Sequence, residues 1–371
     1  MNISFETESL LNGLRTWVEC ESPTWDAAAV GRMMDLASRE LALMGARIER
    51  IAGRMGFGDC VRATLPHPDA DQPGILVLAH LDTVHPVGTL AQLPFRREGD
   101  HAWGPGIQDM KGGTYTALAA VRATRGATKL PVTVLLTSDE EVGSPSTRDL
   151  IEAEASRARF VLVPEPARPD GGLVTGRYAI ARFNLKAIGR PSHAGARLGE
   201  GRSAIREMAK QILAIEAMTT EDATCSVGVV HAGQWVNCVA TTATAESLSM
   251  AKRQADLDAM VERMLALKPT DPDLRFEVTR GVTRPVWEMS AADRALFDLA
   301  KSIAAGIGFT VTPQSAGGGS DGNFTGAMGI PTLDGLGVMG RNAHTLDEHI
   351  DISSLVPRAL LFAGLLTSLG T

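Results

Sequence analysis

The sequence predicts an α/β fold, with a three-layer αβα domain on a mostly parallel sheet and an inserted ferredoxin-like α+β domain. Three observations lead to this prediction. Residues 75–79 form a strand that is apolar throughout, which is typical of a strand covered by helices on both faces. Helical and strand patterns alternate along the first part of the chain, and this rhythm changes near Gly176.

The first part of the chain follows a βαβ rhythm. Helical periodicity appears first, followed by two short β-type runs and then by helix, strand, helix and strand in turn. These segments are residues 8–19, 27–44, 60–65, 74–79, 111–125, 132–137, 146–155 and 160–163. Strands that alternate with helices in this way indicate a parallel sheet.

The middle of the chain has a different order of elements. It reads as strand, helix, strand, strand, helix and strand, over residues 179–188, 203–215, 226–231, 243–249, 257–267 and 275–279. This order is a split βαβ sandwich of about 100 residues, the size of a domain. Helices return from Ala291, followed by a strand at 331–336 and a helix at 353–369. We therefore predict a discontinuous catalytic domain, residues 1–176 and 284–371, and an inserted domain, residues 177–283.

Composition and charge exclude several classes of partner and of metal site. A net charge of −7 without a long basic run argues against nucleic acid or an anionic membrane as the main partner. The start of the chain does not resemble a secretory signal, and no apolar stretch is long enough to cross a bilayer. The four cysteines are scattered without CxxC spacing, which favours a reducing cytoplasm and a metal site made of histidines and carboxylates.

Acids and histidines follow three of the predicted strands, where ligands collect in open α/β sheets. His80 and Asp82 end the strand at 74–79, and Glu165 follows the strand at 160–163. Asp139, Glu140 and Glu141 come directly after the strand at 132–137. Three adjacent acids repel one another unless a cation or protons intervene, so this cluster indicates a metal; a solvated acidic turn is the alternative.

Two further residues complete the candidate metal ligands. Asp109 lies in a glycine-rich loop just before a helix, where an ordinary N-cap is the alternative reading. His344 follows a second glycine-rich stretch. Nitrogen and oxygen ligands without thiolates suit zinc, with manganese or cobalt as substitutes. Two ions about 3.5–4 Å apart need a bridging carboxylate, which a short aspartate can supply.

These motifs, in this order and spacing, resemble the zinc aminoacylase and carboxypeptidase family. It includes glutamate carboxypeptidase, succinyl-diaminopimelate desuccinylase, acetylornithine deacetylase and peptidase T, and the bacterial glutamate carboxypeptidase is the most similar in pattern. The resemblance spans nearly the whole chain and implies two zinc ions per subunit. The resemblance also implies how the ions are held. Asp109 would bridge both ions, His80 and Glu165 would complete one site, and Glu141 and His344 would complete the other.

The same resemblance implies roles for the residues around the ions. Glu140 is the general base, Asp82 orients His80, and the Asp109–Met110 peptide bond is cis. The inserted domain resembles the family's lid and dimerisation domain. Its His193 is implied to reach the partner subunit's site and stabilise the oxyanion. Four residues are implied to contact the substrate: Asn237, Arg280, Gly318 and Gly319.

The sequence also departs from the carboxypeptidase pattern. Met250 stands where that enzyme has an arginine in the lid, and residues 171–174 lack the lysine and serine that would meet a glutamate side chain. Selectivity for glutamate is therefore not implied, although Arg280 would still suit a substrate carboxylate.

We therefore expect a homodimeric, cytoplasmic zinc metallopeptidase of carboxypeptidase type that acts on a small-molecule peptide or N-acyl amino acid. Three alternatives remain open. The first two are an N-acyl amino acid deacylase and a xenobiotic amidohydrolase, because the same ligands would serve all of these reactions. The third is an inactive homologue that only binds a ligand or partner, since a fold alone does not guarantee chemistry.

Overall fold

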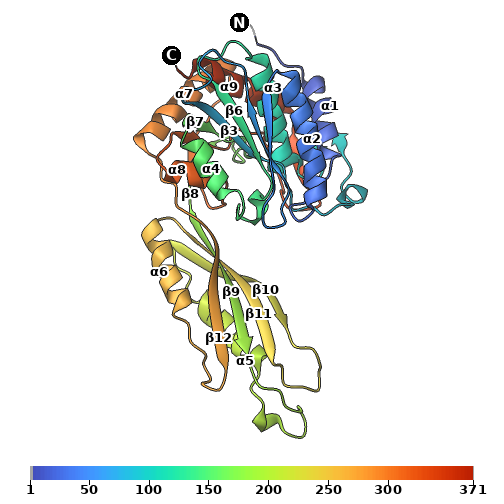
Figure 1. Ribbon diagram of the computed structural model, residues 1–371, viewed down its shortest axis with the longest axis vertical. Helices are drawn as coiled ribbons and strands as arrows, with labels where there is room; N and C mark the ends of the chain where they lie inside the picture. Colours follow the sequence, from blue (N-terminus) through green and yellow to red (C-terminus); the bar gives the residue numbers. More distant parts are fainter. Residues whose placement is uncertain (1–2, 371) are drawn as a thin grey trace. The chain divides into compact units, whose positions relative to one another are not determined.

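The computed structural model describes residues 3–370, and the chain forms two compact units. The first comprises Met1–Arg177, Trp287–Ala316 and Ser320–Thr371, and we call it the α/β unit. The second comprises Tyr178–Val286 with Gly317–Gly319, and we call it the insert unit. Figure 1 shows the helices and strands of both units.

The α/β unit is built on a six-stranded sheet of order β1-β2-β6-β3-β7-β14. The central strand β3 (Gly74–His80) is parallel to its neighbours β6 (Val132–Thr137) and β7 (Ala158–Leu162). The short β14 (Thr332–Leu333) continues the parallel part, and β1 (Arg47–Ile51) and β2 (Cys60–Thr64) form the antiparallel edge. The mostly parallel sheet that the sequence predicts is thus confirmed.

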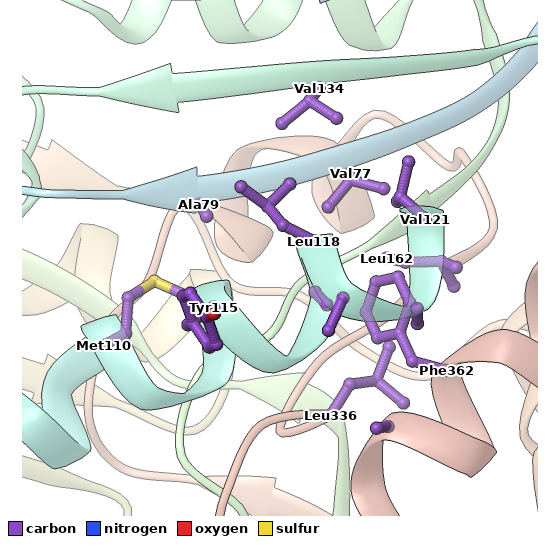
Figure 2. Packing of buried hydrophobic residues seen from close by; sticks show 14 of the residues in the cluster. Val77, Ala79, Met110, Tyr115, Leu118, Val121, Val134, Leu162, Leu336 and Phe362 are labelled. Atoms are coloured by element: carbon purple, nitrogen blue, oxygen red, sulfur yellow. The ribbon is translucent and has the colours of Figure 1, made fainter. Parts of the chain in front are cut away.

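Helices cover both faces of this sheet. Alternate side chains of β3 point to opposite faces and pack into two different apolar clusters. Ile75 and Val77 join the larger cluster, and Leu76 and Leu78 join the smaller one. The larger cluster is built with α1 (Thr7–Val18), α2 (Ala27–Leu43), α3 (Gly113–Ala123), α7 (Ala291–Ile307) and α9 (Leu355–Ser368). The smaller one is built with α4 (Arg148–Ala155) and α8 (Gly322–Ala327). Figure 2 shows α3 side chains in the larger cluster, including Leu118, with Phe362 of α9.

Several short strands were missing from the sequence prediction. One small sheet has the order β15-β16-β5-β4 and another pairs β13 with β8. These strands are β4 (Arg96–Glu98), β5 (His101–Trp103), β8 (Leu173–Arg177), β13 (Pro313–Ala316), β15 (Gly340–Arg341) and β16 (His349–Asp351). Most contain only two to four residues, so they are too short to show periodicity. The edge strand β1 was missed because none of its residues is buried.

The insert unit contains a four-stranded antiparallel sheet of order β10-β11-β9-β12. In chain order its elements are β9 (Ala179–Ile188), α5 (Ala204–Glu216), β10 (Ala223–Ala232), β11 (Thr242–Ala251), α6 (Gln254–Leu265) and β12 (Arg275–Arg284). This is the split βαβ order, which confirms the ferredoxin-like prediction. Residues of β9 alternate between buried and exposed, and their buried side chains share a core with Met208 of α5 and Met260 of α6.

Candidate metal centre

Three of the predicted ligands sit where parallel strands end. His80 is the last residue of β3, and its register partner on β6 is the strand's last residue, Thr137. Glu141 follows β6 in a short 3-10 turn, Glu140–Val142, and Glu165 follows β7 by three residues. Because these strands are parallel neighbours, their carboxyl ends bring the three side chains to one edge of the sheet.

Asp109 and His344 come from irregular segments rather than from strand ends. Asp109 lies in the turn Ile107–Gly112 that precedes α3, and its backbone leaves the helical region with φ −115° and ψ 99°. The Asp109–Met110 peptide bond is cis, as the resemblance implies. His344 lies between β15 and β16 and has a positive φ of 67°. Neither backbone conformation is visible in the sequence alone.

The carboxylate of Asp109 lies between the two imidazoles. Its Oδ1 is 3.3 Å from Nε2 of His80, and its Oδ2 is 3.2 Å from Nε2 of His344. On the first side, His80 Nε2 is also 3.7 Å from Glu165 Oε1. On the second side, His344 Nε2 is 3.1 Å from Glu141 Oε2. The five residues therefore form two half-sites that share one carboxylate.

These separations suit metal ligation. Ligand atoms at about 2.0–2.1 Å from a tetrahedral zinc ion lie about 3.3 Å from one another. The four nitrogen–oxygen distances, 3.1, 3.2, 3.3 and 3.7 Å, are close to that value. Ligand atoms of His80, Asp109 and Glu141, and of His80, Glu140 and Glu165, also lie within 4.8 Å of one another. The donor set therefore fits divalent metal ions.

The electrostatics of the site point the same way. Burial, and next the charge of Asp109, raise the pKa of Glu141 to about 8 and that of Glu165 well above its usual value. Hydrogen bonds to Asp109 and Glu141 raise the pKa of His344 to about 11. The crowded carboxylates thus need positive charge nearby, which protons or divalent cations can supply.

Asp82 is buried beside the proposed ligands. Its carboxylate lies closer to other hydrogen-bond donors than to the imidazole of His80. It accepts hydrogen bonds from the backbone N–H of Glu140 and of Glu141, both at 3.2 Å, and from the Thr24 hydroxyl at 2.8 Å. Nδ1 of His80 is 3.0 Å from the backbone carbonyl oxygen of Asp82 and 3.5 Å from its carboxylate. The carbonyl thus holds the imidazole more closely, and the carboxylate fixes the turn that carries Glu140.

Glu140 is buried at the edge of the ligand cluster. Its Oε2 lies 4.0 Å from Nε2 of His80, and 9% of the residue is exposed. The Asp82 carboxylate accepts the backbone N–H of Glu140, and this hydrogen bond holds the turn that carries the Glu140 side chain. A carboxylate held next to the metal ligands can exchange a proton with a water molecule there.

The remaining predicted site residues belong to the insert unit. His193 is exposed, and its Nδ1 accepts hydrogen bonds from the backbone N–H groups of Gly195 and Ala196, each at 3.1 Å. Asn237 is on the adjacent segment, where its carbonyl accepts the N–H of Ala194 at 3.0 Å. Arg280 on β12 is exposed and donates from Nε to Thr283 at 2.9 Å.

The two glycines differ in the space around them. A Cβ at Gly318 would meet no atom within 4 Å, whereas a Cβ at Gly319 would lie 2.7 Å from Ile180 and 2.8 Å from Arg284. Of the two, only Gly319 is therefore closely packed against neighbouring side chains.

Two buried residues beside the cluster were missed from the sequence. Neither His85 nor Glu348 is among the residues that the sequence predicts for the site; in the structure His85 Nε2 lies 2.7 Å from Glu348 Oε2. The two are 263 positions apart, so no local pattern could have paired them.

The chain is similar in sequence to several known proteins. Residues 76–368 match the model of "Peptidase family M20/M25/M40". Carboxypeptidase G2 from Pseudomonas sp. (strain RS-16) is 31% identical over 380 residues, covering 98% of this chain and 90% of that protein. Succinyl-diaminopimelate desuccinylase from Acinetobacter baumannii (strain ACICU) is 26% identical over 367 residues, covering 90% of this chain and 92% of that protein.

A solved structure supports the fold. The crystal structure of a tripeptidase from Staphylococcus aureus superposes with a TM-score of 0.80 at 20% identity, covering 98% of this chain and 99% of that chain. Among residues 3–370, no helix is both long enough and apolar enough to span a membrane.

Proposed function

This chain belongs to peptidase family M20/M25/M40, a family of hydrolytic metalloenzymes, and on that premise we propose that it uses two zinc ions to cleave an amide bond in a small, carboxylate-bearing substrate. The observation that carries the proposal is the position of Asp109. Its two carboxylate oxygens face the imidazoles of His80 and His344, as a ligand shared by two ions must. Cobalt or manganese would suit the same donors.

Bound between these ligands, zinc ions would polarise the scissile carbonyl and lower the pKa of a water molecule. The protein supplies the proton transfer. Glu140 would take a proton from the attacking water and pass it to the leaving nitrogen. The hydrogen bond from its backbone N–H to Asp82 supports this role, because a fixed turn keeps the carboxylate in place during the transfer.

His193 would stabilise the negative charge that develops on the substrate oxygen. Its Nδ1 accepts two backbone N–H groups, so the ring proton is on Nε2, which is then a donor available to a ligand. A preoriented donor of this kind suits an oxyanion. Arg280 would hold the free carboxylate of the substrate, and Asn237 would add a further contact.

We also propose a homodimer in which His193 serves the partner's site. The supporting observation is an unpaired edge strand in the insert unit. β10 forms one edge of the sheet, and its Val229 and Val230 are 38% and 47% exposed. The following loop exposes Trp235 by 72% and Val236 by 102%. Apolar side chains along a sheet edge favour pairing with a second copy.

The substrate class can be tested with a panel of dipeptides, N-acyl amino acids and other small amides. Zinc-loaded protein should hydrolyse members that carry a free carboxylate, and both chelation and Glu140→Ala should abolish this activity. Hydrolysis of N-acyl amino acids alone would assign a deacylase, and hydrolysis only of amides without a carboxylate would assign a xenobiotic amidohydrolase. No turnover by a chain that holds two zinc ions would favour the inactive binding homologue.

A further inference from the structure

The Glu348 carboxylate accepts four hydrogen bonds beside the proposed metal ligands. It is 1% exposed, and each of its oxygens faces two donors. Oε2 accepts from Nε2 of His85 at 2.7 Å and from the N–H of Gly106 at 3.0 Å. Oε1 accepts from the N–H of Gln108 at 2.8 Å and from the N–H of Asp109 at 3.1 Å. These four bonds use the full accepting capacity of an ionised carboxylate.

The donors and Glu348 itself come from three segments that carry proposed metal ligands. His85 follows His80 by five residues, the loop donors include Asp109, and Glu348 follows His344 by four residues. A second contact joins two of the same segments, because Gln108 Oε1 accepts the backbone N–H of Ala343 at 3.1 Å. The Glu348 side chain thus joins three of the segments that carry proposed ligands.

We propose that Glu348, with His85 as its donor, is a positioning residue that sets the spacing of His80, Asp109 and His344. The inference rests on the proposed metal function and adds to it a residue that contacts neither ion nor substrate. Its contact with the N–H of Asp109 is the critical one, since a shift of that peptide moves the shared carboxylate toward one imidazole and away from the other. Sites of this kind tolerate displacements of only about 0.5 Å.

The position requires a side chain that accepts four hydrogen bonds, two at each oxygen. A glutamine has nearly the same shape, but its amide nitrogen is a donor and would face two of the four N–H groups. Two buried donors would then lose their acceptor, and the loop that carries Asp109 would have to move to regain one. His85 must in turn present a donor at Nε2, which a glutamine can imitate and a leucine cannot.

The test is Glu348→Gln, with zinc affinity measured by competition with a chromophoric chelator and unfolding measured on metal-free protein. The control is Glu154→Gln. Glu154 is also buried, at 7% exposed, and it pairs with Arg62 and Arg157 in the same unit. We expect Glu348→Gln to weaken zinc binding about 10- to 100-fold, the usual effect of removing a partner of a metal ligand. Glu154→Gln should lower stability and leave zinc affinity unchanged.

A second pair of variants keeps the inference testable if Glu348→Gln does not fold. His85→Leu should weaken zinc binding, and His85→Gln should restore much of the affinity. Parental affinity in Glu348→Gln or in His85→Leu would overturn the inference, as would equal losses in Glu348→Gln and Glu154→Gln. A parent chain that binds no zinc would instead contradict the proposed metal centre itself, so the two failures are distinguishable.

Discussion

The two units bury carboxylates in opposite environments. In the insert unit, Glu207 is 1% exposed and accepts hydrogen bonds from Gln211 at 2.8 Å and from the N–H of Thr270 at 2.8 Å. Burial alone would raise the pKa of Glu207, but these hydrogen bonds lower it. In the α/β unit, burial and neighbouring charge raise the pKa values of Glu141 and Glu165. Neutral donors satisfy the first carboxylate, whereas the other two lie among like charges.

The hydrogen-bonded carboxylate of Glu207 stabilises the fold, whereas the crowded carboxylates of Glu141 and Glu165 are explained by a function. A buried carboxylate with enough donors contributes to folding, and a group of carboxylates that repel one another weakens the fold unless a cation joins them. The α/β unit therefore keeps an arrangement that is unfavourable without metal, which is typical of a functional site.

The largest effect should follow from Glu140→Gln. Removing the proposed base should lower kcat by about 100- to 10,000-fold, because proton transfer to the leaving nitrogen is lost. Zinc content should stay the same, since the five proposed ligands are unchanged. Steady-state kinetics and metal analysis of the same sample check this. Parental kcat in the variant would exclude Glu140 as the base.

A somewhat smaller loss should follow from His193→Ala in the insert unit. Removal of an oxyanion donor lowers kcat by about 100- to 1,000-fold. If His193 acts on the partner's site, co-expression with Glu140→Ala should recover about a quarter of the parental activity, because about half of the dimers are mixed and each has one complete site. Purification through two different tags isolates the mixed dimers. No recovery in them would contradict the role in trans.

Stability without metal should fall as pH rises from about 5 to 8. The folded state of metal-free protein holds a proton on Glu141, whose pKa is raised to about 8, while the unfolded chain loses it near its usual pKa of 4.5. The folded state therefore binds more protons in this window, and its stability declines with pH, by a few kcal/mol at about 1.4 kcal/mol per pKa unit.

Denaturant unfolding in excess chelator at several pH values measures this slope, and Glu141→Gln should make it less steep, because Glu165 still contributes. Zinc should restore stability at pH 8, because it binds the folded state. A metal-free protein whose stability rises with pH between 5 and 8 would show that the carboxylates are not crowded as described.

The smallest effect should come from Glu207→Gln, the counterpart in the insert unit. We expect a loss of about 1–3 kcal/mol in the free energy of unfolding, since buried donors lose a charged acceptor. Because the pKa of Glu207 is lowered, its contribution is present above the unfolded pKa of 4.5 and disappears as pH falls through the folded pKa. Denaturant unfolding at pH 7 and pH 3 should show this, with unchanged zinc affinity at pH 7 as the control.

The sequence could predict those parts of the α/β unit that depend on local pattern. The apolar strand at 74–79 and the acids after residue 137 indicate a sheet with a site at its edge, because strand burial and strand ends are local properties. The cis bond at Asp109 and the roles of Glu140 and His193 depended on the family resemblance. The contact between Glu348 and His85 could not be predicted from the sequence, because it joins segments that are distant in the chain.

The expectation for Asp82 came from the family resemblance and concerned its carboxylate. Asp82 was expected to orient His80 with its carboxylate, as acids often do for metal-binding histidines. In the structure the backbone carbonyl of Asp82 lies nearer to Nδ1, and the carboxylate accepts backbone N–H groups of the next segment. Both groups of Asp82 lie near the His80 ring, at 3.0 Å and 3.5 Å, and the orienting role of the carboxylate stays a prediction.

The most direct test of the two-ion centre is anomalous diffraction at the zinc edge from crystals of the zinc-loaded protein. We predict two peaks about 3.5–4 Å apart, one on each side of the Asp109 carboxylate, with His80 and Glu165 near one and Glu141 and His344 near the other. A single peak, or zinc bound away from Asp109, would contradict it.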